Sequence, residues 1–262
     1  MASSNKIAYH TRSISLPTRS NPLTLAVEEQ LCRLRSSELA SSSSICHNLA
    51  GLKDLYECVE DFLQLESTQQ AKSVEGVLDG SLMLLDVCGA AREVLSQMKQ
   101  CVQDLQSSIR RRSNDIGAYM TSRKKVIKVI RKCLSDLKRM NNKNNDLVAE
   151  VSVLREVETT TLSIIESLLS FISGLKQSSW SLVSKLMPAK RVAHKGEEET
   201  SEVMKVDIAL KALISHKSIE VNDVQKPLEA LEMSLQDLEG GLESVFRCLI
   251  KNRVSLLNML NQ

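Results

Sequence analysis

The chain has 262 residues, of which 42% are hydrophobic and 25% are charged, and its formal net charge at pH 7 is +2. This composition excludes an intrinsically disordered chain, and the length suffices for one large helical domain or two smaller ones. One Trp, three Tyr and three Phe are too few for the aromatic platform of an RNA-binding sheet. The most apolar stretch, residues 162–175, is shorter than the roughly 20 residues that span a bilayer, so we expect no transmembrane segment.

Residues 1–21 are predicted to form a disordered, phosphorylatable N-terminal segment. Within it, Arg12, Ser13, Ser15 and Pro17 match the pattern that 14-3-3 proteins read, because phosphate on Ser15 would offer charge and acceptors to an arginine cluster. The first 27 residues also lack acids and are rich in Ser and Thr, as in a transit peptide. Import into a plastid is therefore an alternative to recognition of a phosphorylated motif.

Apolar residues at alternating steps of three and four predict that residues 22–187 form a helical bundle. The first helix should be capped by Asn21, carry Pro22 in its first turn and end near Ala40, before the run of serines at 41–44. Gly76 and Gly80 form a small-xxx-small pair, which predicts a close approach of two helices. Further helices are predicted over residues 45–63, 72–112, 116–140 and 146–174, with a short one around Trp180 that ends before Pro188.

Positive charge is concentrated in one part of the chain. From residue 110 to residue 143 there are twelve basic residues and two acidic residues, a local balance of +10 in a chain of +2. The stretch contains the layout of a bipartite nuclear signal, which makes the nucleus an alternative location: Arg111 and Arg112, ten intervening residues, then residues 123–125 with Lys128. We define the basic patch as Arg110, Arg111, Arg112, Arg123, Lys124, Lys125, Lys128, Arg131 and Lys132.

Residues 123–140 of this stretch are predicted to form a basic amphipathic helix, with Val126, Ile127, Ile130 and Leu134 on its apolar side. Such a helix can bind calmodulin, an anionic membrane surface or nucleic-acid phosphate. Nucleic acid is the least favoured of these partners, because no recognition fold accompanies the charge. The simplest interpretation is that the apolar side is buried in the bundle and the cations face water.

A charged, aperiodic stretch at residues 188–201 predicts a mobile linker, and residues 202–262 are predicted to form C-terminal helices that pack on the bundle. We expect Pro227 to open the last helix, which carries an a/d heptad pattern with one polar member. This seam needs a partner surface; we favour the same chain, and a second copy is the alternative. The heptad seam consists of Leu228, Leu231, Leu235, Leu238, Leu242, Val245, Leu249, Asn252, Leu256 and Met259.

Motifs of enzymes and metal sites are absent from the sequence. The seven cysteines never occur as C-x-x-C and the four histidines are scattered, so we expect reduced thiols in helix cores rather than a zinc site. The chain also lacks a P-loop, a glycine-rich dinucleotide motif and a nucleophile elbow. We therefore predict a non-enzymatic protein with no catalytic residues, no cofactor and no metal.

Three stretches resemble a plant-specific family related to the BYPASS proteins of root and shoot development. They are residues 9–22, with the order Tyr-His-x-Arg-Ser-Ile-Ser-Leu-Pro, residues 49–61 around Leu55 and Tyr56, and residues 78–86, which begin Leu-Asp-Gly-Ser. The likeness extends over nearly the whole chain. It implies a land-plant protein, an all-helical fold, no established enzymatic activity and a role in shoot and root growth.

Together these observations predict an all-α fold, an elongated multi-helix bundle with long antiparallel helices, a C-terminal coiled-coil-like heptad helix and a disordered N-terminus. We expect a cytoplasmic adaptor or regulatory protein that acts in plant development through protein–protein interaction. The alternative is a peripheral membrane protein that uses the basic helix at residues 123–140 and is regulated by phosphorylation or calmodulin.

Overall fold

A computed structural model of the protein describes residues 21–37, 41–65, 74–111, 116–141, 149–174, 201–215 and 221–260. All regular secondary structure in these ranges is helical, which confirms the predicted all-α fold class. Predictions for residues 1–20, for the helix around Trp180 and for the linker up to residue 200 fall outside the described residues. The helices are α1 (Pro22–Ser36), α2 (Ser42–Leu63), α4 (Val74–Arg110), α5 (Ile116–Asn141), α6 (Ala149–Ser173), α7 (Glu202–Ile214) and α8 (Val221–Leu260).

Side-chain caps fix the starts of the N-terminal helices. The Asn21 side chain accepts a hydrogen bond of 2.9 Å from the Leu23 N–H, as predicted for the start of α1. The predicted end near Ala40 is wrong, because α1 stops at Ser36 and Ser37 is extended. The serine run does not close α1 but opens α2, since Ser41 and Ser44 form a capping box that satisfies two backbone donors.

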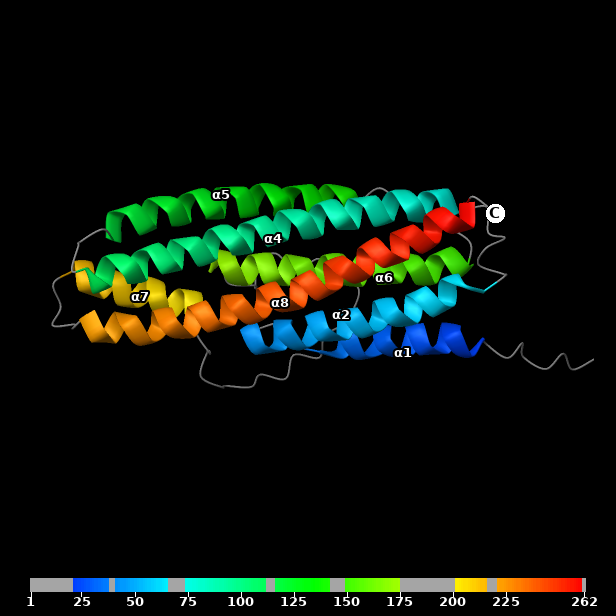
Figure 1. The fold of residues 1–262 in the computed structure, drawn as a ribbon, viewed down its shortest axis with the longest axis horizontal. Helices are drawn as coiled ribbons and strands as arrows, with labels where there is room; N and C mark the ends of the chain where they lie inside the picture. The colour runs from blue at the N-terminus through cyan, green and yellow to red at the C-terminus, as the bar shows by residue number, and fades with distance from the viewer. Residues whose placement is uncertain are drawn as a thin grey trace, which may run out of the picture.

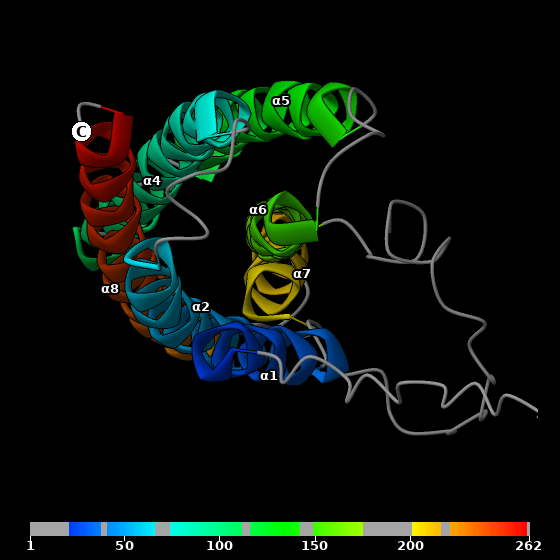
Figure 2. The same ribbon diagram turned by 90° about the vertical axis from the view of Figure 1, so that its right-hand side faces the viewer.

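The long helices form a curved layer. In the end-on view of Figure 2, α5, α4, α8, α2 and α1 follow one another around an arc, and α6 and α7 lie inside it. Figure 1 shows α4 antiparallel to both α5 and α8, as predicted, whereas α2 runs parallel to α8. At 1.5 Å per residue, α4 and α8 are each about 55–60 Å long, so the bundle is elongated.

Helix α6 is the centre of the bundle and contacts α1, α2, α4, α5 and α7. Consistent with this position, its apolar residues are buried on more than one side, including Ile165, Leu168 and Phe171. Three of its buried hydroxyls, those of Thr161, Ser167 and Ser173, donate to carbonyls within the helix, as where Thr161 donates to the Val157 carbonyl at 2.8 Å. The Thr161 hydroxyl also lies 2.7 Å from the Tyr56 hydroxyl of α2, which joins the two helices inside the core.

The heptad seam of α8 faces the interior. Every member from Leu228 to Leu256 is buried, and Met259 packs against the same core. Contacts with α4, α2 and α7 of the same chain cover this side of α8. Asn252, the polar member, donates a hydrogen bond of 3.1 Å to the Tyr56 carbonyl, while its own Oδ1 finds no partner among the described residues.

The start of α8 differs from the prediction. The helix begins at Val221, so that Pro227 lies inside it rather than at its first turn. A proline there removes one backbone donor and crowds the preceding turn. Val224 is fully buried and lies one helical turn before Leu228 on the same side, and its burial explains why the helix extends upstream of the proline.

Close helix approaches occur at glycines other than the predicted pair. A Cβ on Gly76 would meet nothing within 4 Å, and the atoms nearest to one on Gly80 belong to the end of the Glu158 side chain, so this pair does not mark the predicted close approach of two helices. Instead, a Cβ on Gly51 would lie 2.7 Å from Leu34, and one on Gly241 would lie 3.1 Å from Leu49. These two positions let α2 approach α1 and α8 closely.

None of the helices in the described ranges combines the length and the apolar character needed to cross a lipid bilayer.

Candidate functional site

The basic helix predicted from the sequence is α5, which lies at one edge of the curved layer and packs against α4 and α6 (Figure 2). Its inner side is apolar and buried: Val126, Ile130 and Leu134 are at most 2% exposed. Ile127, also assigned to the apolar side, is half-buried. The core therefore takes up most of the apolar side of this helix.

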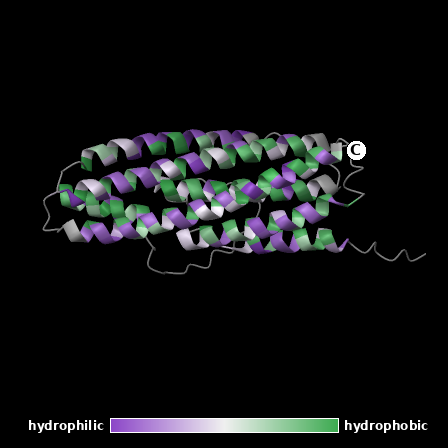
Figure 3. Cartoon of the chain, in the orientation of Figure 1, coloured by the Kyte–Doolittle hydropathy of each residue, from purple (hydrophilic) through white to green (hydrophobic). Residues whose placement is uncertain are grey.

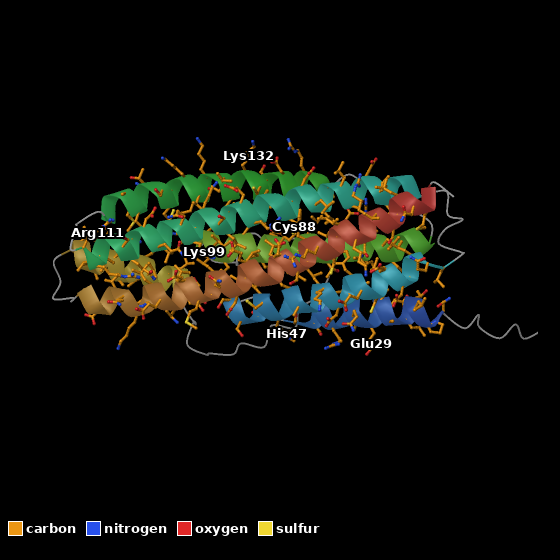
Figure 4. The ribbon with its side chains drawn as sticks, in the orientation of Figure 1. Glu29, His47, Cys88, Lys99, Arg111 and Lys132 are labelled. Carbon is orange, nitrogen blue, oxygen red and sulfur yellow. The ribbon has the colours of Figure 1, made fainter. Side chains whose placement is uncertain are left out.

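The outer side of α5 carries the cations. Figure 3 shows hydrophilic residues along this side, and Lys132 points away from the bundle in Figure 4. We call this surface the α5 cationic face and define it as the exposed residues Lys124, Lys125, Lys128, Arg131 and Lys132.

None of these five cations forms an ion pair with an acidic residue in the described part of the chain. Farther along the helix, Arg139 pairs with Asp136 at 2.5 Å, and Lys138 is half-buried. The cationic face therefore presents five positive charges to whatever lies outside the protein.

Ser135 lies on the same exposed side of α5, and the sequence analysis did not single it out. Its position within the cationic surface follows from helical spacing, because residues three and four apart are neighbours on a helix. Arg131 and Lys132 precede it by four and three residues, and Lys138 and Arg139 follow it by three and four. The sequence contained this signal, but a search for linear motifs does not find it.

Arg123 was predicted to belong to the exposed patch, but the structure places it in the interior, where its side chain is 3% exposed. Its guanidinium donates to the Ile172 carbonyl at 2.9 Å and the Ser173 carbonyl at 3.1 Å, at the C-terminal end of α6. It also pairs with Asp207 of α7 at 3.3 Å. A cation at this position is favoured because the last carbonyls of a helix carry partial negative charge.

The surroundings of Arg123 are built closely around it. Gly174 ends α6 with a φ of +70°, a conformation that suits glycine, and a Cβ there would lie 3.0 Å from the Arg123 Nη2. The nearby Tyr119 hydroxyl is buried and has no partner among the described residues. Burial raises the pKa of Tyr119, although the charge of Arg123 opposes this shift. Arg123 thus joins α5, α6 and α7 and is not available to a partner.

The remaining members of the basic patch lie near the end of α4. Arg110 and Arg111 are exposed, and Arg112 lies outside the described residues. Arg110 also lines a shallow hollow between α4 and α8, together with Gln106, Ile109, Gln225, Leu228 and Glu229. This lining brings no nucleophile next to a base, and it offers no set of metal ligands.

The nuclear-signal pattern and the N-terminal motif remain predictions. The second half of the nuclear pattern is helical and begins with the buried Arg123, so the native fold does not present it as an extended basic peptide. Arg12, Ser13, Ser15 and Pro17 lie outside the described residues.

Cysteines and histidines do not converge. Within the described ranges, no group of three or more His, Cys, Asp or Glu side chains could hold a metal ion. All seven cysteines are free thiols, of which Cys88 and Cys101 are buried and Cys32 is exposed. Desolvation by burial raises the pKa of Cys88 to about 12, so this thiol stays protonated at neutral pH (its position is marked in Figure 4).

A second surface feature, on the outer side of the heptad helix, was not predicted from the sequence. Ile250, Val254 and Leu257 follow one another on the outer side of α8 and are 44%, 50% and 39% exposed. Leu82 of α4 is 47% exposed. We call these four residues the α4–α8 apolar row. The spacing of the three α8 members, four and then three residues apart on the side opposite the seam, is a signal that the sequence contains.

Comparison with known protein families gives a match over most of the chain. A family model described as "Protein BPS1" matches residues 48–259, which extend from α2 into the last turn of α8. No curated protein and no solved structure gives a significant match.

Proposed function

Since the match over residues 48–259 shows that the chain belongs to the BPS1 family, we propose that it is a non-enzymatic helical adaptor acting in plant root and shoot development. The family relation confirms the resemblance to the BYPASS-related proteins, and it supports a developmental role. We place the protein in the cytoplasm, with the nucleus and the plastid as alternatives. The adaptor would act through contact with another protein.

The observation that carries this proposal is the α4–α8 apolar row. Single exposed apolar residues are normal, but a group of them at helical spacing is typical of a helix-mediated interface. Ile250, Val254 and Leu257 have the i, i+4, i+7 spacing of such anchors.

The register of α4 against α8 brings Leu82 to the same level. Arg253 of α8 donates to the Leu78 carbonyl at 2.7 Å and to the Ser81 hydroxyl at 2.8 Å on α4. Farther along the pair, the Arg92 guanidinium of α4 lies 4.5 Å from the centre of the Phe246 ring of α8. With the helices antiparallel, this register places Val254 at about the level of Leu82 and Leu257 at about the level of Leu78, so the row spans both helices.

We assign the row to a partner protein that presents an apolar helix or groove. The test compares wild type with the double variant Val254→Lys, Leu257→Lys, which places charge in the row without touching the buried seam. The matched control is Ile208→Lys combined with Ile214→Lys, because these α7 residues are 54% and 53% exposed but lie on another helix.

Only the row variant should lose a defined crosslinked partner in plant extract and fail to restore growth in a plant that lacks the gene. Growth restored equally by both variants would refute the role of the row. If light scattering instead shows that the wild type is a dimer and the row variant is a monomer, the row binds a second copy of this chain.

A second candidate function is a peripheral membrane protein that binds through the α5 cationic face. The observation in its favour is that the five cations have no acidic partners within the described ranges. In the described part of α5, Val129 is the one large apolar residue that is exposed. Affinity between proteins depends mainly on buried apolar and aromatic anchors, which this face lacks. An anionic leaflet needs only charge, at about 1 kcal/mol for each basic residue near the surface.

Calmodulin is a weaker candidate for α5 than a membrane. It wraps around the apolar side of its target helix, and Val126, Ile130 and Leu134 are buried in the bundle. Binding would require α5 to leave the core. An anionic surface can be met by the outer side of the folded helix.

Liposome flotation tests the membrane candidate. Wild type should float with vesicles that contain anionic phospholipid and should not float with neutral vesicles. The triple variant Lys124→Gln, Lys128→Gln, Arg131→Gln should lose most of this binding. The control Lys205→Gln, Lys211→Gln, Lys226→Gln removes the same charge from exposed positions on α7 and α8 and should bind like wild type. Equal binding by both variants would refute the assignment to α5.

A further inference from the structure

Ser135 is surrounded by cations on the exposed side of α5. The four positions that neighbour it on the helix surface are Arg131, Lys132, Lys138 and Arg139, and all are basic. Such neighbours lie about 5–6 Å apart between Cβ atoms, within reach of long Lys and Arg side chains. Because Arg139 is already paired with Asp136, a phosphate attached at this position would meet its donors on the preceding turn, at Arg131 and Lys132.

The same sequence has the features that a basophilic protein kinase reads. Arg131 and Lys132 lie four and three residues before the serine, where basic side chains pair with acidic groups of such a kinase. The hydroxyl belongs to an exposed residue. Arg131 and Lys132 would therefore act twice: they would attract the kinase to Ser135, and they would bind the phosphate once it is attached.

We propose that Ser135 is a phosphorylation site that switches off the α5 cationic face, an inference that rests on the membrane-binding candidate function above. A kinase would transfer the γ-phosphoryl group of ATP to the Ser135 Oγ. The Oγ–P bond forms, the bond from the γ-phosphorus to the bridging oxygen breaks, the hydroxyl proton passes to the base of the kinase, and ADP leaves. A phosphatase would reverse the change by hydrolysis.

The effect on the cationic face follows from charge. Phosphoserine carries about −1.5 to −2 charges at pH 7, against the five positive charges of the face. It also engages Arg131 and Lys132 in charge-assisted hydrogen bonds, which turns them away from an external anion. Since each basic residue near an anionic membrane contributes roughly fivefold in affinity, phosphorylation should weaken membrane binding by roughly 25-fold.

Another exposed serine provides a matched comparison. Ser96 of α4 is also exposed, but its corresponding helical neighbours are Arg92, Glu93, Lys99 and Gln100. Arg92 and Lys99 are already paired with Glu243 and Glu239 of α8. A negative charge at Ser96 therefore changes the net charge of the protein by the same amount without acting on the α5 cationic face.

The experiment uses the full chain, a basophilic kinase with ATP, and vesicles with and without anionic phospholipid. Mass spectrometry should find phosphate on Ser135 in the wild type and none at that position in Ser135→Ala. Flotation should fall by roughly 25-fold after phosphorylation of the wild type and by roughly fivefold in Ser135→Glu. Ser96→Glu should bind within about twofold of the wild type, and the melting temperature of Ser135→Glu should not fall.

The outcomes separate the two proposals. If unmodified wild type does not float with anionic vesicles, the membrane function fails, whatever the kinase does. If wild type floats but Ser135 is not labelled in the folded chain, or if the phosphorylated chain and Ser135→Glu float as well as wild type, the switch at Ser135 is refuted. An equal loss in Ser96→Glu would also refute it, because overall charge rather than the α5 face would then control binding.

Discussion

Two groups of cations contrast in this protein, those at the interface between α4 and α8 and those on the outer face of α5. Along the interface, Lys99 pairs with Glu239 at 2.6 Å and Arg92 with Glu243 at 2.5 Å. On the opposite side of α8, Lys251 pairs with Glu60 of α2 at 2.6 Å. On α5, the five residues of the cationic face have no such partner among the described residues.

The difference separates charge used inside the fold from charge presented outside it. Pairs across α4 and α8 lie over the buried heptad seam and help to fix which residues of the two helices face each other, although exposed pairs add only about 0–1 kcal/mol each. Among the described residues, no ion pair offsets the repulsion between the five cations of the α5 cationic face. The α8 interface should therefore determine stability, and the α5 face should determine what the protein binds.

Truncation of the α8 seam should give the largest effect. Leu242 is fully buried, and Leu242→Ala should destabilise the protein by about 2–5 kcal/mol, because it leaves a cavity beside α4. Met233 is 70% exposed on the same helix, and Met233→Ala should change stability by less than about 0.5 kcal/mol. Urea unfolding measures both. Similar losses in the two variants would mean that the seam is not the stabilising side of α8.

Replacement of the buried Arg123 of α5 should give the next largest loss of stability. It also allows a buried and an exposed cation to be compared within one helix. Arg123→Met leaves Asp207 and the last carbonyls of α6 without their donor, and we expect a loss of about 3 kcal/mol. The adjacent Lys124 is exposed, and Lys124→Met should be nearly neutral. The pair of variants removes the same kind of charge from neighbouring positions. A neutral Arg123→Met would show that the interior cation is not held as the structure describes.

Much of the fold could be predicted from the sequence, because helix periodicity is a local signal. The caps at Asn21 and the buried seam from Leu228 to Leu256 follow from residue type and spacing alone. The prediction was wrong where helix periodicity and the preference of proline for the first turn of a helix pointed to different starts. Pro227 was expected to start α8, but the burial of Val224 outweighs the backbone bond that proline removes.

The candidate site was less predictable, because it depends on which side of a helix meets the rest of the chain. Arg123 and Lys124 are adjacent and chemically similar, yet one is buried and the other exposed. The partner that decides this is Asp207, 84 residues away in the sequence. Ser135 was missed for the opposite reason, since its neighbours are close in sequence but are recognised only after the outer side of α5 is known.

Two carboxyl groups extend the comparison to pH dependence. Burial raises the pKa of Glu166 on α6, and Lys138 of α5 opposes this shift. Hydrogen bonds from Gln106 and Gln103 lower the pKa of Glu232 at the α4–α8 interface. The two groups should therefore affect stability with opposite sign.

The sign follows from which state binds protons more tightly. Folded Glu166 holds its proton more tightly than the unfolded chain, so it destabilises the fold as pH rises through its ordinary range near 4.3 and above. Glu166→Gln should raise stability at pH 7, and the gain should vanish toward pH 4. Glu232→Gln should lower stability at pH 7, and that loss should shrink only as pH falls below the ordinary value of about 4.3, because the folded pKa of Glu232 lies under it. Denaturant midpoints between about pH 2 and pH 8 measure both variants, and parallel shifts in the two would contradict the assignment.

The smallest effect is expected on the α5 cationic face itself. Lys124 and Lys128 are four residues apart, as are Lys128 and Lys132, and like charges at this spacing destabilise a helix by about 0.2–0.5 kcal/mol per pair. Lys128→Gln relieves both repulsions and should stabilise the protein by several tenths of a kcal/mol at low salt, with no gain at 1 M salt. Lys99→Gln, which breaks the pair with Glu239, should have no stabilising effect at either salt concentration. If Lys128→Gln instead lowers stability, the cation has a partner within the protein, and the contrast between the two regions is lost. A gain that salt abolishes would show that the chain keeps a charge that slightly weakens its own fold, as expected of a charge retained for an external anion.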